Sequence, residues 1–170
     1  MQDTTIEQIQ QPVVPPENVR HVVEVATAAD LDGVVELGRV IHAASSDSAL
    51  TYSGPKVRAL LEHLIASPTA GVLFVTRSEG RVVGGFAGGI SPHLFSEDLI
   101  AFDYAFFVKP GARHGMRSAA LVQAFVIWAR RRGAKRVKVS ATYGLDVAST
   151  ARLFQSLGFT SDGVGFSKEV

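Results

Sequence analysis

The chain has 170 residues, of which 46% are hydrophobic and 19% charged, so it can form a packed core and is not disordered throughout. Lys and Arg total 17 against 16 Asp and Glu, and the net charge of +1 argues against nucleic-acid binding by bulk charge. The absence of cysteine excludes disulfides, thiolate nucleophiles and zinc sites with Cys ligands. No apolar run is long enough to span a membrane and the N-terminus lacks a signal-peptide pattern, so we expect a soluble, cytoplasmic protein without membrane contacts.

The predicted elements follow an N-terminal segment that lacks apolar periodicity. Residues 1–20 contain three prolines and several glutamines, so we interpret them as a flexible tail and residues 21–170 as a single domain. Apolar spacing, caps and turn residues then define ten elements. In chain order they are strand 21–27, helix 30–44, helix 55–66, strands 71–77, 82–90 and 99–108, helix 119–133, strand 135–142, helix 146–158 and a last strand or hairpin in 159–170.

The order β-α-α-β-β-β-α-β-α-β predicts an α/β fold. We expect a mixed, largely antiparallel central sheet flanked by helices, with one βαβ crossover near the middle. Segment 99–108, LIAFDYAFFV, is the most hydrophobic stretch of the chain and is predicted to be a central strand buried on both faces.

The segment KPGARHGMRS (109–118) differs from the starts of the other predicted helices. Those helices begin with residues that can cap free N–H groups, whereas this segment has no Ser, Thr, Asp or Asn before Ser118. Arg113, His114 and Arg117 instead place positive charge at the positive end of the helix dipole, at a cost of about 0.3–1 kcal/mol each. A bound anion would offset that cost, and two glycines would let the backbone approach it. We expect a phosphate cradle here; a solvated basic turn is the alternative.

Three segments of the chain, which occur in the same order as in the superfamily, resemble the GNAT superfamily of N-acyltransferases. VKP (108–110) followed by ARHGMRSAALV (112–122) resembles the superfamily's acyl-CoA pyrophosphate-binding motif. ARLFQSLGF (151–159) resembles its late helix, and EVATAADLDGVVEL (24–37) is similar to its first strand and helix. The resemblance extends from about residue 21 to the C-terminus.

The resemblance implies a GNAT-like domain that transfers an acyl group from acyl-CoA to an amine. Acetyl-CoA is the expected co-substrate, a primary amine of a small molecule or peptide is the expected acceptor, and the amine attacks the thioester directly. The resemblance places the backbone N–H groups of the helix start at the pyrophosphate and the strand end at the pantetheine arm and thioester. The implied CoA-binding residues are Phe107, Val108, Arg113, His114, Gly115, Met116, Arg117 and Ser118.

Two positions depart from the superfamily's pattern. Met116 and Ser118 stand where two glycines or small residues are usual. Phe154 stands where the late helix often carries a catalytic tyrosine, so the usual general acid is missing.

Asp103 and Tyr143 are the candidate catalytic residues. Asp103 is the only acidic residue in the apolar strand, where burial would raise its pKa towards that of a useful base. It is either a general base or anchor for the substrate ammonium, or a structural carboxylate paired with an Arg or at a sheet edge. Tyr143 follows the strand 135–142 and either protonates the departing thiolate or covers the edge of the core. Tyr104, on the opposite side of the strand from Asp103, is expected to pack.

The acceptor would be selected by two loops, 45–54 and 91–98. Tyr52, His93 and Phe95 are the candidate wall residues, with simple loop packing as the alternative. The five histidines have no metal-ligand spacing, so no metal site is expected.

The densest run of positive charge is 129–136, ARRRGAKR. Cations suit the C-terminal end of a helix dipole, so we interpret the run as a solvated helix end, with contact to nucleic acid or to the 3′-phosphate of the cofactor as alternatives. Two other functions therefore stay open: a non-catalytic acyl-CoA-binding module, for which Phe154 argues, and an acyltransferase for an amino-bearing base in nucleic acid. A homodimer also stays open.

Overall fold

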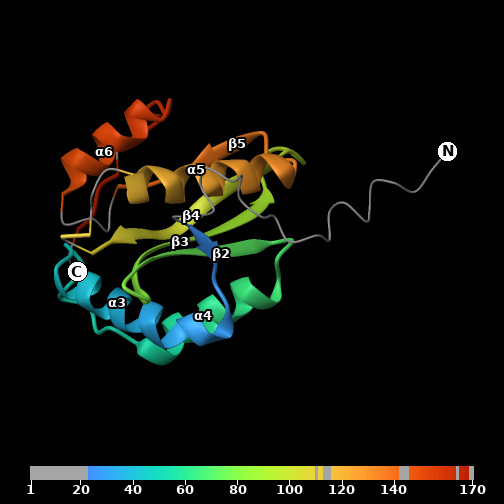
Figure 1. Ribbon diagram of the computed structural model, residues 1–170. Helices are drawn as coiled ribbons and strands as arrows, with labels where there is room; N and C mark the ends of the chain where they lie inside the picture. Colours follow the sequence, from blue (N-terminus) through green and yellow to red (C-terminus); the bar gives the residue numbers. More distant parts are fainter. Residues whose placement is uncertain (1–22, 110, 113–115, 142–145, 164, 169–170) are drawn as a thin grey trace.

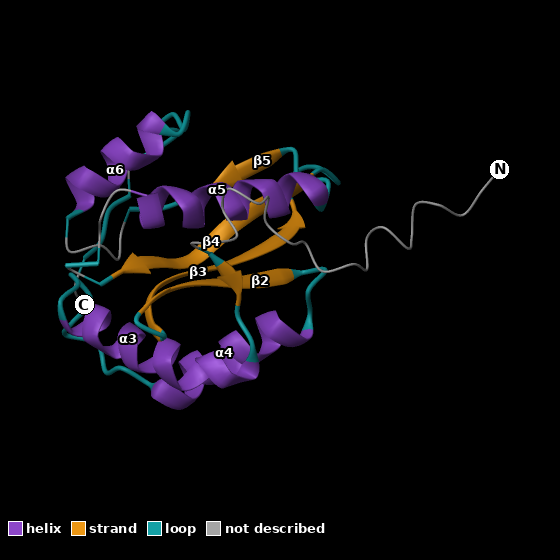
Figure 2. Ribbon diagram, in the orientation of Figure 1, coloured by secondary structure: helices purple, strands orange, loops and turns teal. Residues whose placement is uncertain are grey.

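A five-stranded sheet lies between two layers of helices (Figure 1 and Figure 2). The computed structural model describes residues 23–109, 111–112, 116–141, 146–163 and 165–168. Sheet neighbours follow the chain order β1-β2-β3-β4-β5; all pairs are antiparallel except β4 and β5, which are parallel. The strands are β1 (Glu24–Val25), β2 (Gly71–Ser78), β3 (Arg81–Pro92), β4 (Leu99–Val108) and β5 (Arg136–Lys138). The helices are the 3-10 helix η1 (Ala28–Asp30), α3 (Leu31–Ala43), α4 (Gly54–Ala66), α5 (Met116–Arg131) and α6 (Val147–Ser156).

This architecture confirms the predicted mixed α/β fold with its βαβ crossover, which is β4-α5-β5. The C-terminal strand expected in 159–170 is not formed in the described residues 159–163 and 165–168. Segment 159–170 contains two Ser and two Gly and only four apolar residues, of which Phe159 is separated from Val164 by four residues, so it offers no continuous apolar face for a strand to bury.

The strands that are buried on both faces are β2 and β3, so the prediction of that role for β4 was wrong. Residues 71–76 of β2 are all buried, whereas in β4 only Ala101 and Val108 are buried and Tyr104 is 41% exposed. The reason lies in the partner strand, because β5 has only three residues and pairs only with Ile100–Phe102. The rest of β4 therefore has β3 as its neighbour on one side and no β5 on the other.

Each face of the sheet packs against its own helices. On one face Phe86 stacks on Phe125 of α5 with ring centroids 4.3 Å apart, and Phe125 stacks on Trp128 at 5.5 Å. On the other face Leu73 and Ala87 pack with the apolar residues of α3 and α4. The glycines of β3 allow this close approach, since a Cβ on Gly88 would lie 2.3 Å from the ring of Phe125.

The start of α3 is fixed to the sheet by an ion pair. Asp30 is buried, accepts a hydrogen bond from the Thr27 backbone N–H at 2.9 Å and pairs with Arg77 of β2, which also bonds Glu24. Burial alone would raise the pKa of Asp30, but the hydrogen bonds from Thr27 and Arg77 outweigh it and hold the pKa below its ordinary value. Ser53 caps α4 through the Lys56 N–H in the same way that Asp146 caps α6.

Candidate active site

The middle of β4 contains a β-bulge. Ala87 pairs with Ala105 and Gly88 pairs with Asp103, so Tyr104 has no partner on β3. A bulge of this kind bends the strand and increases its local twist. On its other side β4 pairs with β5 only as far as Phe102, which lies opposite Lys138. The bulge and the end of the β4–β5 ladder therefore coincide at residues 103–104, and from there to Val108 the edge of β4 that faces away from β3 is not paired with β5.

Asp103 lies at the point where the two strands part. Its Oδ1 accepts a hydrogen bond from the backbone N–H of Ser140 at 3.0 Å, and the Ser140 hydroxyl lies 3.3 Å from Oδ1 and 3.2 Å from Oδ2. The carboxylate is half-buried, and burial raises its pKa above the ordinary value while the two Ser140 hydrogen bonds act in the opposite direction. Of the two structural settings that the sequence left open, the described part of the chain shows no Arg ion pair to Asp103, whereas the residue does lie where the edge of β4 is no longer paired with β5; Ser140 holds the carboxylate there.

The register places Asp103 on the α5 face of the sheet. Its partner Gly88 faces Phe125 of α5, and directly paired residues in an antiparallel ladder share a face. Tyr104 points to the other side, where its ring contacts Phe102 with centroids 5.2 Å apart, as expected for a packing role.

The residues implied in CoA binding are only partly within the described ranges. Val108 is buried and Phe107 is half-buried at the end of β4. At the start of α5, Met116 is 73% exposed, Arg117 and Ser118 are half-buried, and the first turn contains no acidic residue. Arg113, His114 and Gly115 lie outside the described residues, as does Tyr143. The described residues at the start of α5 suit a bound anion, because the positive end of the α5 dipole carries Arg117 and no carboxylate.

Phe154 is buried in the apolar cluster between the sheet and α6. It is 6% exposed, and its ring lies 5.8 Å from that of Phe106 and 5.7 Å from that of Phe159. The late-helix position at which the superfamily often has a tyrosine therefore holds a phenylalanine ring. That ring contacts Phe106 of β4, which lies three residues beyond Asp103.

The two predicted acceptor loops lie at different ends of the sheet. The loop between α3 and α4 lies at the end where β4 terminates, and the β3–β4 loop lies at the other (Figure 1). The hydroxyl of Tyr52 donates to the backbone C=O of Val35 at 2.7 Å, and its ring lies 5.4 Å from that of His42. Phe95 is 87% exposed and its ring lies 5.9 Å from that of His93. This second loop ends at Leu99, four residues and about 13 Å along the strand from Asp103.

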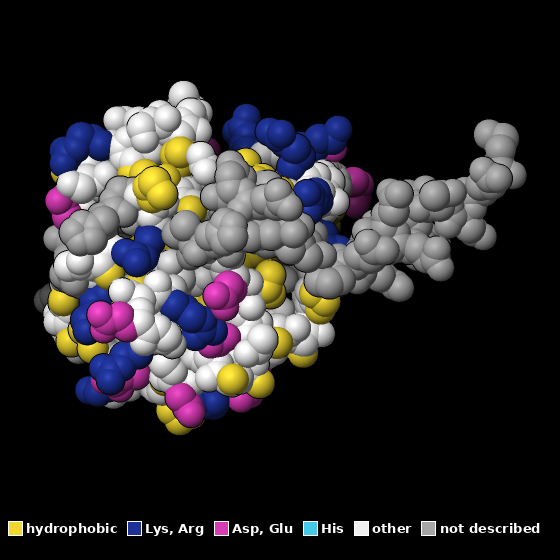
Figure 3. Space-filling model, viewed as in Figure 1, with side chains coloured by type: hydrophobic (Ala, Val, Ile, Leu, Met, Phe, Trp, Pro, Cys, Tyr) yellow, Lys and Arg dark blue, Asp and Glu magenta, His cyan; other side chains and the backbone are white. Residues whose placement is uncertain are grey.

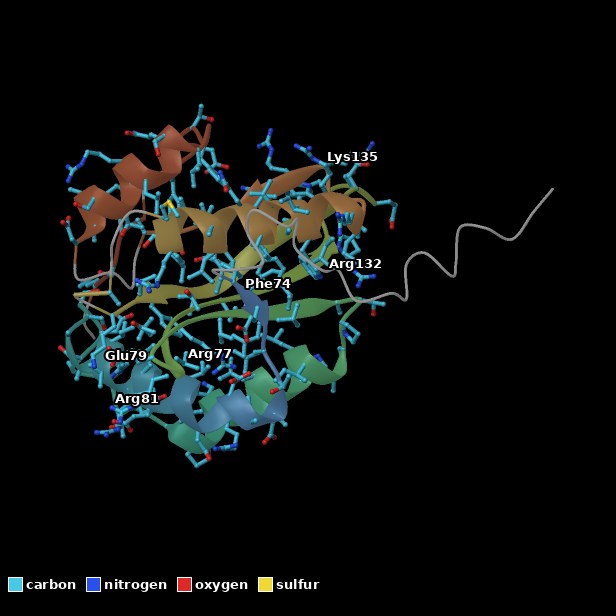
Figure 4. All side chains as sticks on the ribbon, in the orientation of Figure 1. Phe74, Arg77, Glu79, Arg81, Arg132 and Lys135 are labelled. Atoms are coloured by element: carbon cyan, nitrogen blue, oxygen red, sulfur yellow. The ribbon has the colours of Figure 1, made fainter. Side chains whose placement is uncertain are left out.

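The basic cluster at the end of α5 is remote from the start of that helix. Figure 4 shows Arg132 and Lys135 at one end of the sheet and Glu79 and Arg81 at the other. Lys and Arg side chains gather over the first of these ends in Figure 3. Because α5 has 16 residues, its two ends are about 24 Å apart. If the pyrophosphate of CoA is held at Met116–Ser118, the 3′-phosphate of the same cofactor would not reach the basic cluster.

The described residues also form a small pocket away from Asp103. A pocket of about 60 Å³ near the start of β2, lined by Leu64, Trp128 and Arg132 among others, is far smaller than the 300–1,000 Å³ typical of ligand sites. Over the described ranges, no group of three or more His, Asp or Glu side chains could hold a metal ion. None of the described helices is both long and apolar enough to cross a membrane.

Ser140 is the site residue that the sequence did not indicate. It is exposed and lies two residues beyond β5, between Val139 and Ala141, whose half-buried side chains pack against the core, and only the tertiary structure brings it to Asp103. Its position in the predicted strand 135–142 was the only signal in the sequence that could have pointed to it.

Comparisons with known proteins agree with this fold. The chain is similar in structure to an acetyltransferase from Trypanosoma brucei, with a TM-score of 0.65, 18% identity, and coverage of 87% of this chain and 98% of that one. It is similar to an aminoglycoside acetyltransferase from an uncultured soil metagenomic sample, in complex with sisomicin (TM-score 0.66, 19% identity, coverage 87% and 95%). It is also similar to glucosamine-6-phosphate N-acetyltransferase from Arabidopsis thaliana (TM-score 0.66, 14% identity, coverage 86% and 96%).

At these identities the structures support the fold alone, and no curated protein sequence matches the chain. The family assignment comes from the sequence model of the acetyltransferase (GNAT) family, which matches residues 40–159, more than half of the chain. The matched region includes β4 with its bulge, Asp103, the start of α5 and Ser140. The chain therefore belongs to the GNAT family and is an N-acetyltransferase.

Proposed function

We propose that this acetyltransferase moves the acetyl group of acetyl-CoA to a primary amine of a small molecule by direct attack. The observation that carries the proposal is the half-buried carboxylate of Asp103 at the bulge of β4, beside the strand edge that β5 leaves. When bound, acetyl-CoA supplies the thioester carbon that the amine nitrogen attacks, and CoA leaves as the thiol. The backbone at Phe107 and Val108 and the first turn of α5 are the described elements that would hold it.

Asp103 has the chemistry to manage the proton of the amine. An ammonium group must lose a proton before its nitrogen has the lone pair that attacks the thioester, and a carboxylate with a raised pKa is a better base than one in open water. Both Asp103 oxygens retain lone pairs beyond those that Ser140 occupies, since a carboxylate has about four acceptor positions. An ammonium group could therefore bind to Asp103 first and give up its proton there.

Tyr143 is proposed as a proton donor for the departing thiolate. A thiol of pKa near 8.5 leaves without strong acid help, so the absence of a tyrosine at position 154 does not prevent the reaction. We expect Tyr143→Phe to slow transfer by no more than about 10²-fold, the low end of acid–base contributions.

A small molecule is the favoured acceptor class. Fold neighbours include an aminoglycoside acetyltransferase and a glucosamine-6-phosphate N-acetyltransferase, which both act on amino sugars by name. The rival acceptor, an amino-bearing base in nucleic acid, loses its support because the basic cluster is about 24 Å along α5 from the proposed cofactor end.

The test is release of CoA thiol from acetyl-CoA over a panel of amines. The chain contains no cysteine, so a thiol reagent detects only the product. The panel comprises sisomicin, glucosamine-6-phosphate, a polyamine and a lysine peptide, and we expect turnover with at least one amino sugar. Turnover with the peptide alone would overturn the small-molecule class.

A thermal-shift assay separates an inactive protein from a non-catalytic binding module. CoA at about 100 times its dissociation constant should add about 2.7 kcal/mol to the free energy of unfolding. CoA binding without turnover on any amine would favour the module, the function for which Phe154 argues. Arg113→Glu should abolish the shift while the free protein stays folded, because the proposal assigns Arg113 to the ligand.

A further inference from the structure

Ser140 and Asp103 meet where the parallel ladder between β4 and β5 ends. The last paired residues are Phe102 and Lys138, and the N–H of Lys135 bonds the C=O of Leu99, so the N–H groups of alternate residues from Lys135 onwards face β4. In a continued ladder the Ser140 N–H would therefore point away from β4. It instead donates to the side chain of Asp103 at 3.0 Å, so the chain beyond β5 turns this N–H towards β4 where β4 bulges and β5 departs.

Ser140 offers two donors to this carboxylate, its backbone N–H and its hydroxyl. The Ser140 hydroxyl lies 3.3 Å and 3.2 Å from the two oxygens, so with its single hydrogen it bonds one of them, while the N–H bonds Oδ1. Two donors on one residue fix the carboxylate in two directions, more tightly than a single flexible partner would. The alternative of an Arg partner, which would neutralise the charge of the base, is not what the described residues show.

We propose that Ser140 is a positioning residue for acetyl transfer: its N–H and hydroxyl hold the carboxylate of Asp103 in the gap between β4 and β5, with its remaining lone pairs directed to the acceptor amine. The inference rests on the proposed role of Asp103 as the base. It makes Ser140 act through Asp103, without contact to the reacting atoms.

Burial is the largest influence on the pKa of this carboxylate, and the Ser140 hydrogen bonds are the largest influence that opposes it. On β5, Lys138 pairs with Asp162 at 3.2 Å, and Arg136 is exposed two residues earlier. On β3 the only charged residue is Arg81 at the strand's first position, and α5 carries charge only at Arg117 and at its last two residues. Loss of the Ser140 hydroxyl should therefore raise the pKa of Asp103, since burial would then be less opposed.

The test compares Ser140→Ala with Ser140→Thr, which retains the hydroxyl in a residue suited to extended backbone. We expect Ser140→Ala to lower kcat by about tenfold through looser placement of the base. The acidic limb of its pH profile should move to higher pH, with the KM for acetyl-CoA unchanged within about twofold. Ser140→Thr should restore both. Ser156→Ala, which removes an exposed hydroxyl bonded to the Leu153 C=O on α6, is the matched control and should behave as wild type.

A double-mutant cycle decides whether Ser140 acts through Asp103. Asp103→Asn can still accept from the Ser140 N–H but cannot take a proton, so it should lower kcat by about 10²–10⁴-fold. In that background Ser140→Ala should have no further effect beyond about twofold. An equal loss in both backgrounds, or a Ser140→Ala variant with wild-type rate and pH profile, would overturn the proposal.

Failure of the proposed function can be distinguished from failure of the proposal for Ser140. If wild-type protein transfers no acetyl group, the proposed function is wrong. If wild-type protein is active and Asp103→Asn is equally active, the base is elsewhere and Ser140 has nothing to position. NMR titration of the Asp103 carboxyl carbon in the free protein tests the hydrogen bond itself: its pKa must be higher in Ser140→Ala than in wild type, and equal values would also overturn the proposal.

Discussion

Gly88→Ala should destabilise the protein by forcing α5 away from the sheet. A Cβ at position 88 would lie 2.3 Å and 2.6 Å from two ring carbons of Phe125 and 3.0 Å from the backbone oxygen of Phe102. Carbon atoms pack at about 3.5–4.0 Å, so the Phe125 ring would have to move by roughly 1.2 Å or more. That ring is fully buried and held on its other sides by Phe86 and Trp128, which leaves it no free direction.

The size of the effect follows from two opposed contributions. Overpacking of a well-packed core costs about 1–3 kcal/mol. Replacing glycine within a strand returns about 0.5–1 kcal/mol, because alanine has less conformational freedom to lose on folding. We expect a net loss of about 1–2 kcal/mol in the free energy of unfolding, or a fall in Tm of about 2–4 °C per kcal/mol at this chain length.

Urea unfolding followed by fluorescence measures this loss directly. Trp128 is the only tryptophan in the chain, is 2% exposed and lies against Phe125, so its emission reports the cluster that the new methyl group disturbs. Gly89→Ala is the matched control, because its Cβ would meet only the partly exposed rings of Tyr104 and Phe102 at 3.1–3.2 Å and should cost less than about 0.5 kcal/mol. Adding Phe125→Leu to Gly88→Ala should make the loss smaller than the sum of the single changes. Equal stability of Gly88→Ala and Gly89→Ala would refute the reasoning.

Three further predictions concern Asp30, Phe154 and Tyr143. Asp30→Asn should lower stability by about 1.5–3 kcal/mol at neutral pH, since it loses charge-assisted hydrogen bonds to Thr27 and Arg77. The pKa of Asp30 is lower in the folded than in the unfolded protein. The contribution of its charge to stability is therefore complete above the unfolded-state pKa near 3.9 and is lost as the pH falls through the pKa of the folded state. Unfolding curves from pH 6 down to about 2 should therefore converge for the two proteins; parallel curves would contradict this. Phe154→Tyr should lose about 1–3 kcal/mol with activity unaltered, since its hydroxyl would enter an apolar cluster, whereas unchanged stability would mean that the hydroxyl reaches the open side of β4. Tyr143→Phe should reduce the steady-state rate by no more than about 10²-fold, and a larger loss would make Tyr143 indispensable.

The sequence alone determined the family and the order of the elements from the first strand to α6. Apolar spacing and caps are local properties, so a helix such as α4, with Ser53 and Pro55 at its start, can be placed from its own residues. The motif residues around the start of α5 and in α6 carried the resemblance, and the family match over 40–159 confirmed it. The assignments of Asp103, Tyr143 and the acceptor loops stay predictions.

Burial was less predictable, because it depends on the neighbours that a strand acquires. LIAFDYAFFV is the most hydrophobic segment, yet β4 is half-exposed since β5 covers only three of its residues. The glycine-rich β3 has little to indicate a core strand in composition, and it is buried because Gly88 and its neighbours let α5 approach. Hydrophobicity is a property of residues, whereas burial is a property of the assembled sheet.

Only the tertiary structure decided the environment of Asp103. The sequence marks a lone carboxylate in an apolar strand but says nothing of its partner, 37 residues away. A bulge at Tyr104 and a short β5 place that carboxylate at the Ser140 N–H, and both depend on long-range pairing register, which local spacing does not encode. For the same physical reason the loops 45–54 and 91–98, alike in composition, lie at different ends of the sheet: strand direction, set by pairing, decides which loops meet at a site.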